Sequence, residues 1–231
     1  MPDAVVLPVY NEASTVDAVL AAVRDHFDGI VIVVDDGSTD GAKQILARRS
    51  DIVTLCRDDN RGYGRSLIDG LEMAVSLGAE RIVTMDCDGQ HEPAHIPAFL
   101  AALADTDIAS GSRYLGESVA VGAAPPERRA VNERVTAVIN ETTGWHLTDA
   151  FCGFKAYRAD AIRALHLTEN GYAMPLELWA QAWRAGLRVS ELPVERIYFD
   201  NDRSFGADLD DHEKRFCYYL RVWKSALTQE A

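Results

Sequence analysis

Carboxylates stand directly after an apolar run in the stretch MDCDGQH, residues 85 to 91. Asp86 and Asp88 lie one residue apart there, and two carboxylates so close repel each other unless a cation lies between them. Oxygen ligands suit Mg²⁺ or Mn²⁺, and Gln90 adds a neutral oxygen within reach. The stretch therefore predicts a metal site formed by Asp86, Asp88 and Gln90, with a solvated strand-end turn as the plainer alternative.

The position of this acidic pair matters more than its spacing. The pattern D-x-D occurs four times in the chain, at Asp86/Asp88, Asp105/Asp107, Asp200/Asp202 and Asp208/Asp210. Only the first pair follows a strongly apolar strand at its carboxyl end, which is where open α/β sheets place their ligands. We therefore assign the metal chemistry to the first pair alone.

Two further apolar runs also end in polar residues. Asp35 and Asp36 follow the run at 29 to 34, and Pro8, Tyr10 and Glu12 lie at the end of the run at 4 to 9. The carboxyl ends of parallel strands meet at one edge of a sheet, so these residues and Asp86/Asp88 are expected to share a crevice. A carboxylate there can accept a hydrogen bond from a ribose hydroxyl or a base N–H. The convergence predicts a site for a nucleotide and a metal ion.

The elements that must position these residues alternate through the first half of the chain. Apolar runs that predict strands alternate with stretches that predict helices, and this pattern is typical of a mostly parallel sheet with right-handed crossovers. The predicted strands are 4–9, 29–34, 51–56, 80–85 and 107–112, and the predicted helices are 13–26, 39–49, 63–77 and 94–104.

The pattern loosens after Arg113. A stretch rich in Gly, Pro and Ala, residues 116–128, predicts a loop. Helices are expected at about 127–143, 175–184 and 210–227, with one further strand at 187–194. The simplest account is a single α/β domain with a C-terminal extension.

Composition limits the class of protein. The chain has 231 residues, 48% of them hydrophobic, and no apolar run approaches the roughly 18 residues of a membrane span. The first residues lack the features of a secretion signal, and the four cysteines form no C-x-x-C pair, so a cytoplasmic protein without a zinc site or disulfide framework is expected.

The net charge of −13 argues against nucleic acid as a partner, because nucleic-acid binding needs a basic surface. The chain has 4 Lys against 19 Arg and 22 Asp against 14 Glu, a balance that suits either concentrated salt or an ordinary acidic cytosolic protein.

Two common nucleotide motifs are missing. The sequence contains no G-x-x-x-x-G-K-[ST], which excludes a P-loop. The stretch RGYGRSL has Gly62 and Gly64 but Leu67 where a dinucleotide fingerprint needs its third glycine, so NAD binding is not expected.

Several stretches, in this order and spacing, resemble the family 2 glycosyltransferases with the GT-A fold: PVYNE, VDDGSTD, NRGYGRSL and DCDGQH. Later stretches resemble, more narrowly, the dolichyl-phosphate mannose synthase branch, the polyprenyl-phosphate hexosyltransferases: SGSRYLG, ERRAVNERVT, TDAFCGFKAYR and ELPVERIY. The resemblance implies a Rossmann-like single domain in which helices flank a mostly parallel sheet and the C-terminal helix is amphipathic. Its expected parts are a nucleotide-sugar half (1–112), an acceptor half (113–206) and the C-terminal helix (207–231).

The resemblance also implies roles for single residues. Pro8, Tyr10, Glu12, Asp35, Asp36 and Asp86 would surround the nucleotide sugar, while Asp86, Asp88 and Gln90 would hold Mg²⁺ or Mn²⁺ at its diphosphate. Arg113, Arg128, Arg129 and Arg203 correspond to positions that handle phosphate. The branch usually has a lysine after its last strand, in a segment similar to R-x-x-G-x-S-K, and this chain lacks it, which leaves the acceptor open.

Two acceptors are therefore considered. A dolichyl or polyprenyl phosphate is already anionic and needs no general base, whereas a saccharide hydroxyl needs one, and Asp149 is then the best candidate. Asp88, Asp149 and Arg113 are the expected catalytic residues. The implied activity is inverting transfer of a hexose from GDP-mannose or a UDP-hexose, and a non-catalytic nucleotide-sugar-binding protein is the third alternative.

A lipid acceptor would bring the protein to a membrane surface, on the inner face of the cell membrane. The predicted C-terminal helix carries an apolar stripe that could lie in the membrane interface or simply dock on the core. Its members are Phe216, Tyr219, Leu220, Trp223, Ala226 and Leu227.

Overall fold

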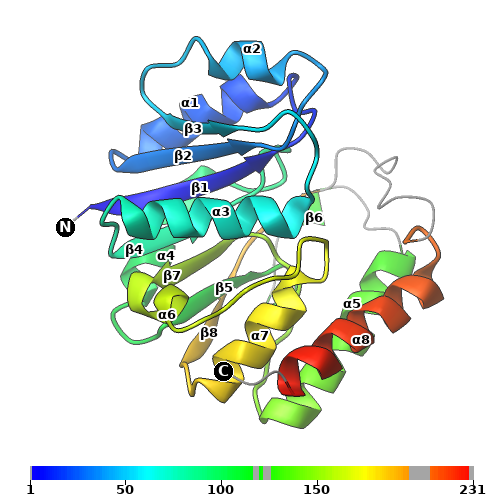
Figure 1. Ribbon diagram of the computed structural model, residues 1–231. Helices are drawn as coiled ribbons and strands as arrows, with labels where there is room; N and C mark the ends of the chain where they lie inside the picture. The colour runs from blue at the N-terminus through cyan, green and yellow to red at the C-terminus, as the bar shows by residue number, and fades with distance from the viewer. Residues whose placement is uncertain (1, 117–119, 122–125, 198–208, 229–231) are drawn as a thin grey trace.

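A seven-stranded sheet with the order β3-β2-β1-β4-β7-β5-β8 runs through the protein (Figure 1). The structure, a computed structural model, describes residues 2–116, 120–121, 126–197 and 209–228. All neighbouring strands are parallel except β7, which is antiparallel to both β4 and β5. The strands are β1 (Asp3–Val9), β2 (Ile30–Asp35), β3 (Val53–Cys56), β4 (Arg81–Thr84), β5 (Ile108–Ser112), β7 (Lys155–Arg158) and β8 (Val189–Pro193), and a two-stranded ribbon pairs β6 (Ala120–Val121) with β9 (Arg196–Ile197).

Helices cover both faces of this sheet, as a mostly parallel sheet requires. Alternate residues of one strand enter different cores: Val6 of β1 packs with α3 and α7, whereas Val5 and Leu7 pack with α1, α2 and α4. The helices are α1 (Val16–His26), α2 (Ala42–Leu46), α3 (Tyr63–Ser76), α4 (Ile96–Ala102), α5 (Pro126–Thr143), α6 (Ala159–Arg163), α7 (Met174–Arg184) and α8 (His212–Thr228), and a short 3₁₀ turn, Pro93–His95, precedes α4.

The strand order reverses between β1 and β4. From β1 the chain adds β2 and β3 on one side and then returns to place β4 on the other. Ligands of open α/β sheets bind at such a reversal, beyond the carboxyl ends of the strands. The residues that follow β1, β2 and β4 therefore lie where a binding site is expected.

The structure differs from the sequence analysis at β7 and α6, which were not predicted. The segment Gly153–Arg158 has no apolar run, and its Lys155 is buried. Because β7 is antiparallel, its first residues lie at the edge where β4 and β5 end, so the segment just before it, 149–153, reaches the predicted crevice. Helix α2 is also shorter than the expected 39–49, since it begins only at Ala42 and already ends at Leu46.

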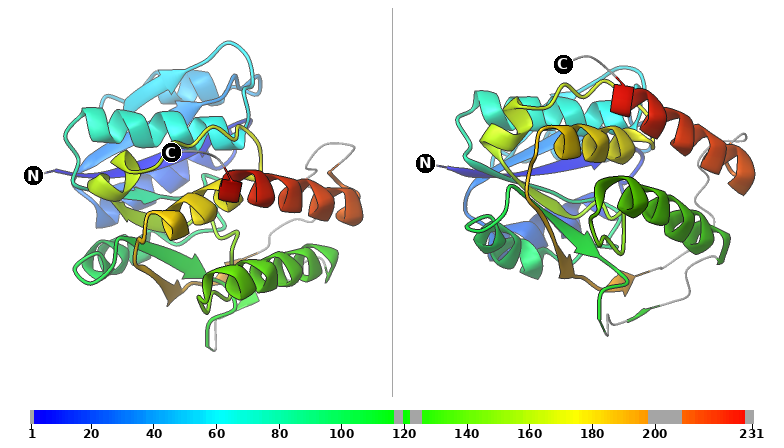
Figure 2. Two further views of the ribbon diagram at one scale, coloured as in Figure 1. Left: turned by 60° about the horizontal axis from the view of Figure 1, so that its bottom comes forward. Right: turned by 90° about the horizontal axis from the view of Figure 1, so that it is seen from below.

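Helix α8 lies beside α5 and α7 in all three views (Figures 1 and 2). Its residues Tyr219, Trp223 and Ala226 are buried in the larger core cluster, so the centre of the expected apolar stripe docks on the protein itself. Within the ranges that the structure describes, no helix is both long enough and apolar enough to cross a bilayer.

Candidate functional site

A cavity of about 950 Å³ opens at the edge of the sheet where β1, β2 and β4 end. Its size falls within the range of pockets that hold small organic ligands. Acidic and polar residues from these strand ends border it, and residues of α5, α8 and the segment after β5 close it on another side. The residues predicted for the site that border the cavity are Pro8, Tyr10, Glu12, Asp36, Asp86, Asp88, Gln90, Arg113 and Arg128.

The pair Asp86 and Asp88 directly follows β4. One oxygen of Asp86 accepts a hydrogen bond of 2.8 Å from the Tyr63 hydroxyl, and Asp88 Oδ1 accepts one of 2.9 Å from the backbone N–H of Gln90. Burial, together with the neighbouring Asp86 charge, raises the pKa of Tyr63 well above its usual value. Tyr63 thus stays a hydrogen-bond donor at neutral pH and orients the Asp86 carboxylate.

The close approach of Gly153 also shapes this pair. A Cβ atom on Gly153 would lie 2.5 Å from Asp86 Oδ2, so only glycine lets the segment before β7 pass beside the carboxylate. The carbonyl of Gly153 accepts a hydrogen bond of 2.9 Å from Thr84 Oγ1, which fixes the approach.

The carboxylate and amide oxygens at this edge of the cavity fit a hard divalent ion. The phosphates of a bound substrate would complete the coordination of that ion. Among the residues placed in the structure, His, Cys, Asp and Glu form no group of three or more suited to a metal ion. Mg²⁺ is usually bound by one or two carboxylates together with substrate phosphates and water. Asp86, Asp88 and Gln90 border the cavity in that number and with that chemistry. Their role as metal ligands stays a prediction.

Asp36 already makes strong contacts within the protein. Its Oδ1 accepts hydrogen bonds from Arg57 Nη1 at 2.5 Å and from the Arg61 N–H at 2.9 Å, and its Oδ2 accepts one from the Gly62 N–H at 2.9 Å. Arg57 also bonds Ser66 and Asp69. Asp36 thus holds the loop before α3 against the end of β2, and one of its edges still borders the cavity.

Asp35 lies deeper than its neighbour. It is fully buried and is not among the described residues that border the cavity. Its Oδ1 accepts a hydrogen bond of 3.2 Å from the Ser38 N–H, whereas Oδ2 has no hydrogen-bond partner among the described residues. The predicted nucleotide-binding role of Asp35 is untested.

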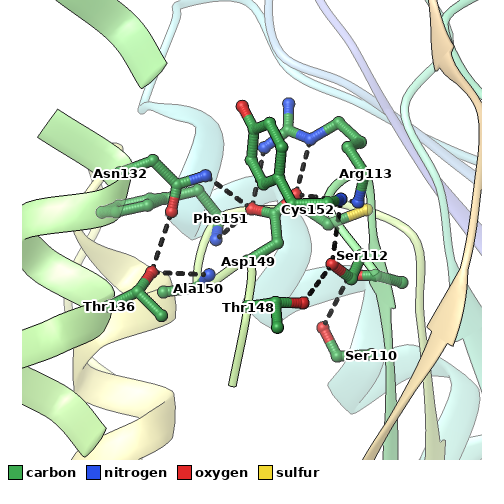
Figure 3. Close-up of polar contacts among 12 residues, drawn as sticks. Ser110, Ser112, Arg113, Asn132, Thr136, Thr148, Asp149, Ala150, Phe151 and Cys152 are labelled. Carbon is green, nitrogen blue, oxygen red and sulfur yellow. Dashed lines mark hydrogen bonds and ion pairs between the residues drawn. The ribbon is translucent and has the colours of Figure 1, made fainter. Parts of the chain in front are cut away.

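Arg113, whose side chain is about one fifth exposed, forms an ion pair with the fully buried Asp149 (Figure 3). Arg113 Nε lies 2.7 Å from Asp149 Oδ2, and Nη2 lies 2.9 Å from Oδ1. Asn132 of α5 donates a further hydrogen bond of 2.7 Å to the same carboxylate. This two-point pairing holds the Arg113 guanidinium in one orientation where it borders the cavity.

These contacts weaken the case for Asp149 as a general base. Its side chain is fully buried and is not one of the described residues around the cavity. Burial alone would raise the pKa of Asp149, but the Arg113 charge and the hydrogen bonds from Arg113 and Asn132 lower it below its usual value. A carboxylate with a depressed pKa is a weak base, so the geometry favours a positioning role.

The remaining predicted arginines divide into three cases. Arg128 borders the cavity. Arg129, one residue later on α5, is exposed, pairs with Glu133 at 2.7 Å and lies 5.3 Å from the centre of the Tyr114 ring. Arg203 lies outside the described residues.

Several cavity residues were not predicted. Tyr63 and Tyr172 stack with ring centres 5.8 Å apart, and Asn132 and Arg215 border the cavity from α5 and α8. Tyr63 and Asn132 lie inside stretches that carry the family resemblance, which could have singled them out. No local signal marks Arg215, because its place depends on how α8 packs.

Comparison of the sequence with known proteins identifies its family. A family model described as "Glycosyl transferase family 2" matches residues 4–165. The chain is 31% identical to an undecaprenyl-phosphate mannosyltransferase of Micrococcus luteus, over 82% of this chain and 81% of the relative. It is 25% identical to a UDP-N-acetylglucosamine–dolichyl-phosphate N-acetylglucosaminyltransferase of Methanococcus voltae, over 88% of this chain and 89% of the relative.

Solved structures show the same fold. The glucosyl-3-phosphoglycerate synthase of Mycobacterium tuberculosis, in complex with Mn²⁺, UDP and glucosyl-3-phosphoglycerate, superposes with a TM-score of 0.74 at 19% identity. The alignment covers 100% of this chain and 81% of that one. At this level of identity the likeness establishes the GT-A architecture.

Proposed function

The chain belongs to glycosyl transferase family 2, and from this membership we propose that it transfers a hexose from a nucleotide sugar to a polyprenyl phosphate. The proposal includes dependence on Mg²⁺ or Mn²⁺ and inversion at the anomeric carbon. A phosphate oxygen of the acceptor forms the new bond to that carbon, and the bond to the donor diphosphate breaks, with the electron pair leaving on the diphosphate.

One observation carries the proposal: a single cavity joins acidic strand ends to arginines. Glu12, Asp86 and Asp88 border one part of it, and Arg113 and Arg128 border another. Carboxylates suit a cation and the polar groups of a nucleotide, whereas guanidinium groups suit a phosphate. A site that holds a metal-bound diphosphate donor beside a phosphate acceptor accounts for both kinds of side chain.

On the donor side, the ends of β1 and β2 would hold the nucleoside. Tyr10 is half exposed at the cavity and offers a flat ring, and Asp36 supports the loop that carries Gly62. Asp86, Asp88 and Gln90 would hold the divalent ion, which, when bound, stabilises the negative charge of the departing diphosphate. Tyr63 keeps Asp86 turned toward that position.

On the acceptor side, a lipid phosphate is already ionised at neutral pH, so the reaction needs charge stabilisation and positioning but no base. Arg113 would supply both, since Asp149 and Asn132 fix its orientation. A saccharide hydroxyl would need a base instead. The burial and low pKa of Asp149 favour the phosphate.

The donor sugar stays within the class of GDP-mannose or a UDP-hexose. The Micrococcus relative is named for mannose and the Methanococcus relative for N-acetylglucosamine, so the names support a hexose donor in general. A lipid acceptor also implies work at a membrane surface, and we place this on the inner face of the cell membrane as part of the proposal.

A transfer assay with purified protein tests the proposal. The protein is incubated with Mn²⁺ or Mg²⁺, a polyprenyl phosphate and one labelled donor, either GDP-mannose, UDP-glucose or UDP-N-acetylglucosamine. We expect one donor to yield a labelled lipid, and we expect chelation of the metal to stop its formation. Asp88→Ala should lower the rate at least about a hundredfold, because it removes a ligand of the metal ion that stabilises the charge on the departing diphosphate. Asp105→Ala, in another D-x-D, is the matched control. No labelled lipid from any donor, or full activity in Asp88→Ala, would contradict the proposal.

A further inference from the structure

Arg215 is a buried arginine that α8 places at the cavity. Its side chain is 4% exposed, it borders the cavity, and its Nη1 donates a hydrogen bond of 2.7 Å to the carbonyl of Leu209. By contrast, Lys214, Arg221 and Lys224 of the same helix are exposed. Arg215 is thus the cation that this helix turns inward.

The packing of α8 fixes this direction. Arg215, Tyr219, Trp223 and Ala226 share the buried side of the helix, at spacings of four, four and three residues. Arg134 of α5 holds the start of α8, because its guanidinium lies 3.8 Å from the centre of the Phe216 ring and Nη1 lies 2.5 Å from Glu213 Oε1. The orientation of Arg215 therefore comes from the body of the protein.

Arg215 of α8 and Arg128 of α5 border the same cavity. Tyr219 also borders it, and although burial raises the pKa of Tyr219, the positive charges of Arg215 and Arg128 both oppose that rise. The three residues border the cavity from α5 and α8, and these two helices lie next to each other (Figure 2). The acids at the ends of β1 and β4 form a different side.

A guanidinium that borders a cavity while most of its surface is buried is held in a fixed orientation. Its five N–H donors in a planar fork match the oxygens of a phosphate, and the arginines already described at this cavity place positive charge on the same side. A phosphate in this cavity could meet Arg128 from α5 and Arg215 from α8.

We propose that Arg215 of α8 binds the phosphate of the acceptor, together with Arg128 of α5. The inference rests on the proposed function and extends it, because it makes the C-terminal helix part of the acceptor site. It follows that the helix contributes directly to recognition of the anion as well as to packing.

The first test compares kinetics of three variants with farnesyl phosphate as acceptor. Arg215→Gln should raise the acceptor KM about tenfold to a hundredfold, the loss expected for a charged hydrogen bond, and leave the donor KM unchanged. Arg215→Lys keeps a point charge, so its acceptor KM should lie between that of the wild type and that of Arg215→Gln. Arg221→Gln removes the same charge from an exposed position of α8 and should behave as wild type. A donor KM that rises in place of the acceptor KM would overturn the assignment.

A second measurement needs no active variant, in case Arg215→Gln does not fold. The Nε–H signal of Arg215 in wild-type protein, assigned with Arg215→Lys, should shift when farnesyl phosphate is added and stay in place with farnesol. An unchanged signal, while the protein binds farnesyl phosphate, refutes the role of Arg215 and leaves the proposed function standing. A wild-type protein that binds donor but neither binds farnesyl phosphate nor glycosylates it refutes the lipid-phosphate acceptor itself.

Discussion

Single side chains in this site depend on partners that are distant in sequence. Asp86 is oriented by Tyr63, Asp36 by Arg57, and Arg113 by Asp149. The acids and Arg113 could be predicted because each follows an apolar run. Their partners could not, because a contact such as that between residues 113 and 149 depends on where β7 brings the chain. The sequence analysis therefore named both members of this ion pair but assigned them separate roles.

The ion pair between Arg113 and Asp149 should contribute to stability in a pH-dependent way. Asp149→Asn leaves the Arg113 charge without its partner, and we expect the free energy of unfolding at pH 7 to fall by about 3 kcal/mol, the low end for a broken buried pair. The folded-state pKa of Asp149 is lowered, so the wild-type advantage is full above the unfolded value of about 3.9 and is lost as the pH falls through the folded pKa.

Urea unfolding of both proteins between pH 7 and pH 3 checks this prediction. Asp160→Asn is the control, because Asp160 is exposed and pairs with nearby, exposed Arg163, and it should change the free energy by less than about 0.5 kcal/mol. A difference between wild type and Asp149→Asn that stays constant down to pH 3 would show that the carboxylate charge is not the cause.

At the scale of elements, the alternation of strands and helices was predictable and β7 was not. Strands β1, β2, β4 and β5 have apolar runs that enter two cores, and the expected ranges match the observed ones closely. Strand β7 contains Lys155, whose ammonium group donates to the Cys152 carbonyl and lies 5.4 Å from the centre of the Trp179 ring. A short strand with a buried cation gives no apolar pattern to detect.

The start of α3 is another element whose position depends on close packing. A Cβ atom on Gly64 would lie 2.3 Å from the carbonyl oxygen of Glu169 and 2.7 Å from that of Gly171, in the loop that carries Tyr172. Gly64→Ala should displace this loop or Tyr63, and we expect kcat/KM to fall about tenfold to a hundredfold, as small misplacements near a reacting centre do.

Steady-state kinetics with whichever donor yields labelled lipid in the transfer assay, together with circular dichroism to confirm folding, test Gly64→Ala. Ser76→Thr adds the same methyl group at the exposed end of α3 and serves as the control. Unchanged kinetics in Gly64→Ala would mean that the loop can move without cost to the site.

At the scale of the whole molecule, charge is the dominant feature. The net charge of −13 produces repulsion among surface carboxylates, which favours the unfolded chain at low ionic strength. Salt screens this repulsion, since the Debye length falls from about 10 Å at 0.1 M to about 3 Å at 1 M. The composition thus predicts that the protein gains stability in salt, whether or not it comes from a saline habitat.

We expect the Tm at pH 7.5 to rise by several degrees between 0.05 M and 1 M NaCl. The same scan at pH 4.8, close to the isoelectric point, is the control and should show little change, because the net repulsion is then absent. A Tm that falls with salt at pH 7.5 would mean that screened ion pairs, such as Arg134 with Glu213, outweigh the repulsion.

Strand β7 lies between β4, which leads into Asp86 and Asp88, and β5, which leads into Arg113. Adjacent strands are about 4.8 Å apart, so the two flanking strands are separated by roughly 10 Å. In the proposed reaction, a ladder of backbone hydrogen bonds, and not a loop, would therefore set the gap between donor and acceptor. The same paired strands would thus keep Asp86 and Asp88 at a fixed distance from Arg113, whichever sugar or lipid is bound.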